Sequence, residues 1–200
     1  MHTFFHLDTQ PSTVWKNGAG LTQQLVAWPL NADSDRFDAR VSVAEFHSEV
    51  PFSVFTRTDR HMTLISETGF TLHGCGTEID ADSVHLNQRW DMYEFRGEVA
   101  HTATVHGAAV RVLNVMTQRG QCTAHVAVHH QRFELQKVGK GLLLSFDGPS
   151  ACNGQIENTL LRTTLGPNAG VWWTCQTKHA FWQVDPMGSS CISVVIQDVA

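Results

Sequence analysis

The densest chemistry in the sequence lies in residues 15–22, which read Trp-Lys-Asn-Gly-Ala-Gly-Leu-Thr. Lys16 and Asn17 can donate hydrogen bonds to an anion or a carbonyl, and the two glycines let the backbone approach a ligand closely. Gln23 stands where a dinucleotide fingerprint places its third glycine, and no Gly-Lys-Ser/Thr of a phosphate loop follows. Two interpretations stay open: a ligand-binding stretch, or a tight turn between two strands with Trp15 in the core.

A second set of polar side chains lies in segments whose sequence is strand-like. Arg40 and Arg60 together would make a cation-lined pocket for a small carboxylate, because arginine binds a carboxylate through two parallel hydrogen bonds. The alternative is that each arginine forms an ordinary ion pair with a turn acid such as Asp38 or Asp59. Asn114 lies in an apolar run and needs hydrogen-bond partners if it is buried. The polar positions in strand-like context are Lys16, Asn17, Thr22, Arg40, Ser42, Ser53, Arg60, Arg111 and Asn114.

The 12 histidines raise the question of a metal site. No His-x-His and no His-Glu-x-x-His occurs. His125 and His129 could share one face of a strand, but His130 would point to the other face, and a further ligand would be needed. No Gly-x-Ser-x-Gly nucleophile elbow is present. The sequence therefore predicts no metal and no cofactor, and it leaves the identity of any catalytic residue unknown.

Composition restricts the class of protein. The chain has 200 residues, 42% of them hydrophobic, and a net charge of −5, which suits one large domain or two small ones and argues against a nucleic-acid or anionic-membrane partner. No run of 18 apolar residues occurs, and the N-terminus lacks the features of a signal peptide. We therefore expect a cytoplasmic protein, in which a homodimer is one possible assembly. Its five cysteines are expected to be mostly buried, small hydrophobes.

Hydrophobic periodicity predicts β-structure throughout. Residues 37–46 alternate strictly, so Arg40, Ser42 and Ala44 share one strand face with Phe46; this polar face either meets water or lines a cavity. Strand-like segments recur every 8–12 residues, separated by turn residues, as in an all-β sandwich or barrel. Residues 65–69 and 144–148 share the pattern apolar-Ser-x-x-Gly, which suggests two related halves with a boundary near residues 117–121.

Four ordered stretches resemble the HutD/Ves family of bicupin-like proteins. Residues 15–22 are similar to its Trp-Lys/Arg-Asn-Gly/Ala-Gly/Ala-Gly-x-Thr signature, and residues 40–44 to its Arg-x-Ser-x-Ala strand. Residues 51–60 are similar to Phe-Ser-x-Phe-Pro-Gly-x-Asp/Glu-Arg, and residues 113–119 to Phe/Leu-Asn-x-Met-x-x-Arg. The chain departs from the family where Thr-Arg replaces Pro-Gly in the third stretch, and where Val112 replaces a common Asp.

This resemblance implies an all-β, cupin-type (jelly-roll) double β-barrel, a bicupin with few or no helices. The N-terminal barrel is expected over residues 1–118 and the C-terminal barrel over residues 119–200, packed as one compact unit, with strands that can be exchanged between barrels. The resemblance also implies a ligand pocket in the first barrel. Its expected ligand-binding residues are Lys16, Asn17, Thr22, Arg40, Ser42, Ser53, Arg60 and Asn114.

The function implied by the resemblance is that of a metal-free, cupin-type small-molecule-binding or regulatory protein. Its ligand would be a small carboxylate linked to histidine or other amino-acid catabolism. The alternative is a cupin enzyme, an isomerase or hydrolase, acting on a small organic acid. A structural protein without a ligand is a third option. The sequence leaves the ligand, any catalysis and the oligomeric state open.

Overall fold

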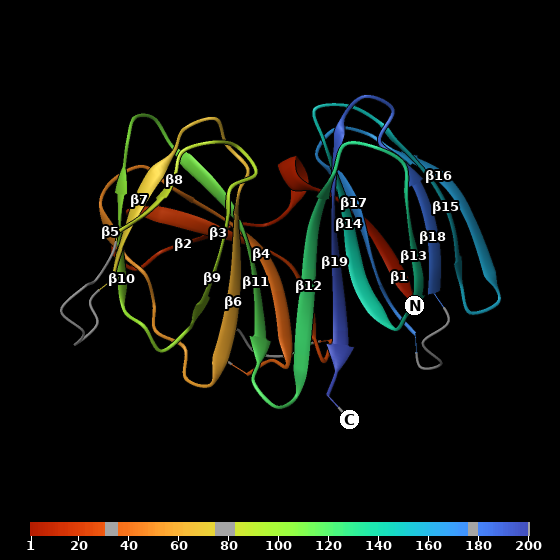
Figure 1. The fold of residues 1–200 in the computed structure, drawn as a ribbon, viewed down its shortest axis with the longest axis horizontal. Coiled ribbons are helices and arrows are strands. Elements are labelled where there is room, and N and C mark those ends of the chain that lie inside the picture. Colours follow the sequence, from red (N-terminus) through yellow and green to blue (C-terminus); the bar gives the residue numbers. More distant parts are fainter. Residues whose placement is uncertain (31–35, 75–82, 176–179, 200) are drawn as a thin grey trace. The chain divides into compact units, whose positions relative to one another are not determined.

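The computed structural model describes residues 1–30, 36–74, 83–175 and 180–199, and strands dominate it (Figure 1). Its single short helix is a 3-10 turn, η1 (Leu7–Thr9), and no α-helix occurs among the described residues. No helix in that part of the chain is long and apolar enough to cross a membrane. The chain divides into a first unit, Pro11–Gln121, and a second unit, Met1–Gln10 with Cys122–Ala200.

The first unit consists of two antiparallel sheets. The six-stranded sheet has the order β2-β3-β4-β11-β6-β9, with bounds β2 Thr13–Val14, β3 Gly20–Trp28, β4 Ala39–Phe46, β11 Val110–Gln118, β6 Thr58–Leu64 and β9 Met92–Arg96. The four-stranded sheet has the order β5-β10-β7-β8, with bounds β5 Val50–Pro51, β10 His101–Val105, β7 Phe70–Gly74 and β8 Val84–Leu86.

The core of the first unit is made by side chains from both of its sheets. Alternation along β4 buries Phe46, and alternation along β7 buries Phe70 and Leu72. The rings of Phe46 and Phe70 meet edge to face, with centroids 5.4 Å apart. The inner face of the six-stranded sheet is therefore the face that carries Phe46.

The second unit also consists of two antiparallel sheets. Its five-stranded sheet has the order β1-β17-β14-β19-β12, with bounds β1 His2–His6, β17 Ala169–Thr174, β14 Lys140–Phe146, β19 Ser190–Asp198 and β12 Cys122–His129. Its four-stranded sheet has the order β13-β18-β15-β16, with bounds β13 Phe133–Val138, β18 Ala180–Asp185, β15 Ser150–Ile156 and β16 Thr159–Leu165. Trp173 and Trp182, both fully buried, pack together in its core, with ring centroids 5.2 Å apart.

Four cysteines, Cys122, Cys152, Cys175 and Cys191, are buried with free thiols, as the sequence predicts. Burial raises the pKa of the Cys152 and Cys191 thiols to about 12. These two side chains therefore behave as small hydrophobes. Cys75 lies outside the described residues.

The all-β prediction with few helices is confirmed. Each unit pairs two open sheets around a shared core, and no sheet among the described residues closes on itself, so closure into barrels remains a prediction. The first ten residues lie in the second unit, because β1 pairs with β17. The predicted division at residue 118 placed them in the first barrel.

Candidate functional site

A polar patch lies on the inner face of the six-stranded sheet. Because Phe46 points into the core, period-two alternation along β4 puts Ser42 and Arg40 on the same inner face. The register places Asn114 of β11 opposite Ser42, and Met116 opposite both Arg40 of β4 and Arg60 of β6. Three adjacent strands thus bring these side chains into two neighbouring rows.

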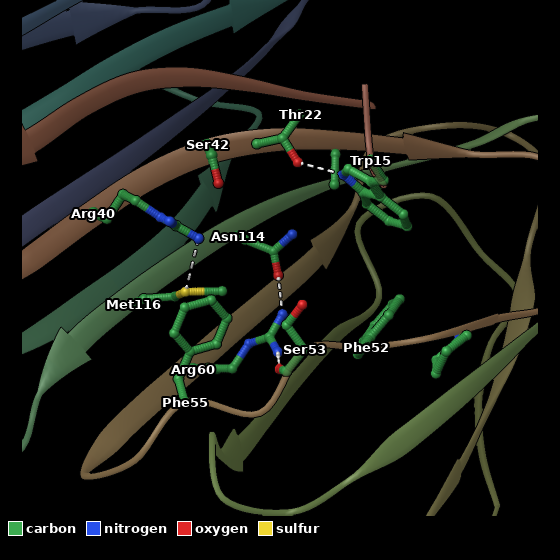
Figure 2. A pocket seen from close by; sticks show the side chains of 12 residues that line it. Trp15, Thr22, Arg40, Ser42, Phe52, Ser53, Phe55, Arg60, Asn114 and Met116 are labelled. Carbon is green, nitrogen blue, oxygen red and sulfur yellow. Dashed lines mark hydrogen bonds between the residues drawn. The ribbon is translucent and has the colours of Figure 1, made fainter. Parts of the chain in front are cut away.

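These rows form one wall of a cavity of about 120 Å³. Its other walls come from the β2–β3 hairpin and from residues 51–55, which run from the end of β5 (Figure 2). The lining residues are Trp15, Thr22, Arg40, Ser42, Ala44, Pro51, Phe52, Ser53, Phe55, Arg60, Asn114 and Met116. The polar face of residues 37–46 therefore lines a cavity, which was one of the two alternatives for it.

Arg60 is held in place by two hydrogen bonds and is only 5% exposed. Its Nη1 donates to the carbonyl oxygen of Ser53, and its Nη2 donates to Oδ1 of Asn114, each over 3.2 Å. Since a guanidinium only donates, Asn114 must present its oxygen to Arg60. The amide nitrogen of Asn114 then lies on the side away from Arg60 (Figure 2), where it can donate to a ligand.

The surroundings of Arg60 disfavour the charged form of its guanidinium group. Burial, and then repulsion by Arg40, lowers the pKa of Arg60 to about 9. The group is therefore still protonated at pH 7. No described carboxylate lies within ion-pair distance of Arg60, and Asp59 instead pairs with Arg119 over 2.9 Å. The ion-pair alternative with Asp59 is thus not what the structure contains.

Arg40 supplies the second cation. Its Nη2 contacts the sulfur of Met116 over 3.4 Å, and its Cζ lies 5.0 Å from the ring centre of Phe37 and 5.3 Å from that of Phe55. The Cζ of Arg60 lies 5.8 Å from the same Phe55 ring. Phe55 therefore contacts both guanidinium groups, and cation–π attraction helps to hold the two like charges near one another.

Residues 15–22 form a tight turn between two strands, which was one of the two interpretations of this stretch. The amide of Trp15 donates to the carbonyl of Gly20, and the amide of Gly18 donates to the carbonyl of Trp15, each over 2.9 Å. Nε1 of Trp15 donates to Oγ1 of Thr22 over 2.8 Å, and the indole stacks on Phe46. The turn thereby places the side chains of Trp15 and Thr22 in the wall of the cavity.

The structure brings together most of the residues that the sequence proposes for ligand binding. Thr22, Arg40, Ser42, Ser53, Arg60 and Asn114 line the cavity. Lys16 and Asn17 are exposed in the turn and are not among the lining residues, and Oδ1 of Asn17 accepts a hydrogen bond from the amide of Ala19.

Sequence reasoning missed the aromatic and sulfur-containing lining of the cavity, namely Trp15, Phe52, Phe55 and Met116. Each of the four lies inside one of the motifs that carry the family resemblance. Met116 also follows Asn114 by two positions, which is the spacing of one strand face. This period-two spacing was the available signal.

The cavity does not fit a metal ion. Its described lining contains no His, Cys, Asp or Glu, and it carries two cationic side chains. Elsewhere in the described parts of the chain, no three such side chains are grouped to hold a metal. His129 bonds Ser193 over 2.8 Å, and its ring stacks on Phe133. Burial, with His125 and His130 nearby, lowers its pKa to about 4.

Solved structures place the architecture among the cupin-type proteins. A protein of unknown function from Pseudomonas aeruginosa PAO1, PA5104, superposes with a TM-score of 0.84 and 18% identity, covering 98% of this chain and 99% of that one. An oxalate decarboxylase from Lactobacillus farciminis, in a formate complex, superposes with a TM-score of 0.67 and 6% identity, covering 98% and 88%. The protein thus has a cupin-type fold.

The family can be stated more closely. The HutD family model matches residues 7–190, and the chain belongs to this family. Protein Ves of Citrobacter koseri is 30% identical over 193 residues, 96% of this chain and 93% of that protein. The structure of HutD from Pseudomonas fluorescens SBW25, in a formate condition, superposes with a TM-score of 0.77 and 17% identity over 100% of both chains. The resemblance to the HutD/Ves family is confirmed.

Proposed function

We propose that the protein is a metal-free, cupin-type small-molecule-binding or regulatory protein, and that the cavity of the first unit binds a small carboxylate from histidine or other amino-acid catabolism. One observation carries this proposal. Two arginines and a buried Asn114 converge on one cavity whose described lining has no acidic side chain. A bound carboxylate would balance the buried charge of Arg60.

The donors in the cavity suit a carboxylate. Arg60 can offer further N–H groups beside the two already bonded to Ser53 and Asn114. The amide nitrogen of Asn114 and the hydroxyl of Ser42, which is only 2% exposed, add neutral donors. Hydrogen bonds between charged groups strengthen where water is excluded, and the rings of Trp15 and Phe52 help to exclude it.

The lining also favours binding over turnover. The side chains described around the cavity include none of the usual general bases, His, Asp, Glu or Cys. Two structural relatives were solved in the presence of formate, the oxalate decarboxylase and HutD. Formate is the simplest carboxylate, and this makes it a suitable first probe.

The test is a calorimetric titration of the purified protein with formate, glutamate, urocanate and N-formylglutamate, with and without a divalent metal. We expect at least one acid to bind without metal. Arg60→Met should weaken its binding about 10- to 150-fold, because a charge-assisted hydrogen bond contributes about 1.5–3 kcal/mol. Arg96→Met removes the same charge from an exposed position on β9 and serves as the matched control.

Three results would contradict the proposal. The first is that no acid binds under any condition. The second is that Arg60→Met binds as tightly as the unaltered protein, which would place the acid elsewhere. The third is steady conversion of an acid by the purified protein, which would favour the isomerase or hydrolase alternative.

A further inference from the structure

A second hollow lies against the carboxylate cavity in the first unit. This groove has a volume of about 800 Å³, against about 120 Å³ for the cavity. Its lining residues are Pro29, Arg36, Phe37, Asp38, Ser53, Val54, Phe55, Thr56, Thr58 and Gln118. Ser53 and Phe55 line both hollows, so these two residues form the wall between them.

The part of this wall made by Phe55 is not a sheet element. Residues 52–55 have no regular secondary structure, and backbone hydrogen bonds attach them to β10 and to the residue that follows β9. The amide of Phe52 donates to His101, and the amide of Phe55 donates to Gly97, each over 2.8 Å. The Phe55 ring is partly exposed, and it packs against the side chains of Phe37 and Arg40. The ring thus lies between the two hollows.

The size of the cavity makes this position of the ring informative. A cavity of about 120 Å³ is smaller than the roughly 300–1,000 Å³ of typical ligand pockets. A carboxylate head fits it, but a ligand with a chain of several further atoms needs space beyond Phe55. The groove offers that space, with apolar surface from Phe37 and Val54.

We infer that the protein binds carboxylates with an amide-bearing tail, that the tail lies in the groove, and that Phe55 determines the accepted length. This inference rests on the proposed carboxylate site. Hydroxyl, amide and charged side chains line the groove, from Thr56, Gln118, Arg36 and Asp38. The hydroxyl of Thr58 instead donates to the carbonyl oxygen of Thr56 over 3.2 Å. Such a mixture of donors and acceptors suits the N–H and C=O groups of an amide better than it suits a plain alkyl chain.

The test compares three probes by calorimetry: formate as the head alone, N-acetyldiglycine as an acid with an amide-bearing tail, and hexanoate as an acid with an alkyl tail. The readout is the ratio of the formate Kd to the Kd of each longer acid. We expect N-acetyldiglycine to bind the unaltered protein at least 10-fold more tightly than formate. The affinity of hexanoate should exceed that of formate by a smaller factor.

Three variants locate the tail. Val54→Trp fills the groove from a residue that is 52% exposed and does not line the cavity; it should abolish the gain and leave formate binding unchanged. Phe55→Ala opens the wall and should raise the ratio for N-acetyldiglycine about 10-fold. Phe52→Ala is the matched control, because Phe52 lines the cavity but not the groove. This variant should leave the ratio of the formate Kd to the N-acetyldiglycine Kd unchanged.

The outcomes separate this inference from the proposed function. If formate binds and the ratio is the same in all variants, the groove holds no tail, and only the inference fails. A gain seen with hexanoate but not with N-acetyldiglycine would overturn the assignment of an amide-bearing tail. If no acid binds, the proposed function and the inference fail together.

Discussion

At the scale of single residues, the most informative feature of the site is that Arg60 is buried with no acidic partner among the residues that the structure describes. A buried charge normally requires an ion pair, because removing it from water costs free energy. Neutral acceptors alone compensate only part of this cost for a guanidinium in a core. Its partners Ser53 and Asn114 orient it toward the cavity. This arrangement suits a group that is completed by a bound anion.

The pH dependence of binding follows from the pKa of Arg60. Only its charged form attracts an anion, and burial with repulsion from Arg40 lowers this pKa to about 9. The affinity for formate should therefore be constant up to about pH 8 and should fall as the pH rises through 9, by up to about tenfold per unit. Titrations from pH 7 to pH 10 measure this. An unchanged Kd across the range would show that Arg60 does not bind the acid.

Stability offers a second check on Arg60. Replacing a buried polar cluster by apolar side chains of similar size is often neutral or stabilising. Arg60→Met combined with Asn114→Leu removes both partners at once, and exposed Ser53 can bond water instead. We expect the ligand-free double variant to gain about 1 kcal/mol, or roughly 2–4 °C in Tm, and to lose acid binding.

Thermal or urea unfolding of the double variant measures this effect. A loss of more than about 2 kcal/mol, in the range of a broken core contact, would mean that the cluster is needed for folding. That result would contradict the interpretation of Arg60 as a residue kept for ligand binding.

At the scale of elements, the β2–β3 hairpin shows how close packing in a turn can position side chains at a site. A Cβ atom added at Gly20 would lie 2.5 Å from the carbonyl oxygen of Glu45 and 2.9 Å from the Trp15 ring. No side chain fits there unless β3 and β4 separate. The close approach at Gly20 therefore sets the position of the Trp15 ring at the cavity.

Gly20→Ala should accordingly destabilise the protein by about 1–3 kcal/mol, the usual range for overpacking, and should weaken acid binding. Gly166→Ala is the control, because a Cβ at Gly166 meets nothing within 4 Å. Urea unfolding together with calorimetry would measure both effects. Equal stability of the two variants would contradict this account of the hairpin.

The same element shows what the sequence can and cannot predict. The alternation of residues 37–46 was sufficient to place Arg40 and Ser42 on one face, because side-chain direction in a strand follows from the period alone. The outward position of Lys16 and Asn17 could not be predicted, since it depends on the conformation of the turn. The bond from Arg60 to Asn114 depends on the register of β6 against β11, two strands far apart in the sequence.

At the scale of the whole chain, the first strand belongs to the second unit. Residues of β1 pair with β17, Phe5 facing Gly170, and Phe5 is 8% exposed. A Cβ added at Gly170 would lie 2.3 Å from the Phe5 ring, so the ring covers this glycine. Periodicity predicts a strand near the N-terminus, but the choice of its partner depends on contacts across more than 160 positions.

Phe5→Ala should therefore cost about 3–5 kcal/mol of unfolding free energy, as for other buried phenylalanines, and should speed amide exchange in β1 and β17. Phe4→Ala, at the neighbouring position that is 46% exposed, should change stability by no more than about 0.5 kcal/mol. Hydrogen exchange with mass spectrometry distinguishes the two. Exchange in β17 that is equally slow in both variants would show that β1 adds little to the second unit.

The most direct test of the central claim is NMR of the guanidinium groups in arginine-labelled protein during a formate titration. Arg60→Met identifies the Arg60 signals by their absence. If the cavity binds carboxylates, the Arg60 and Arg40 signals shift saturably, with one Kd that matches calorimetry, while the Arg96 signals stay in place. Saturable formate binding that leaves the Arg60 and Arg40 signals unmoved would show that the carboxylate site is not in this cavity.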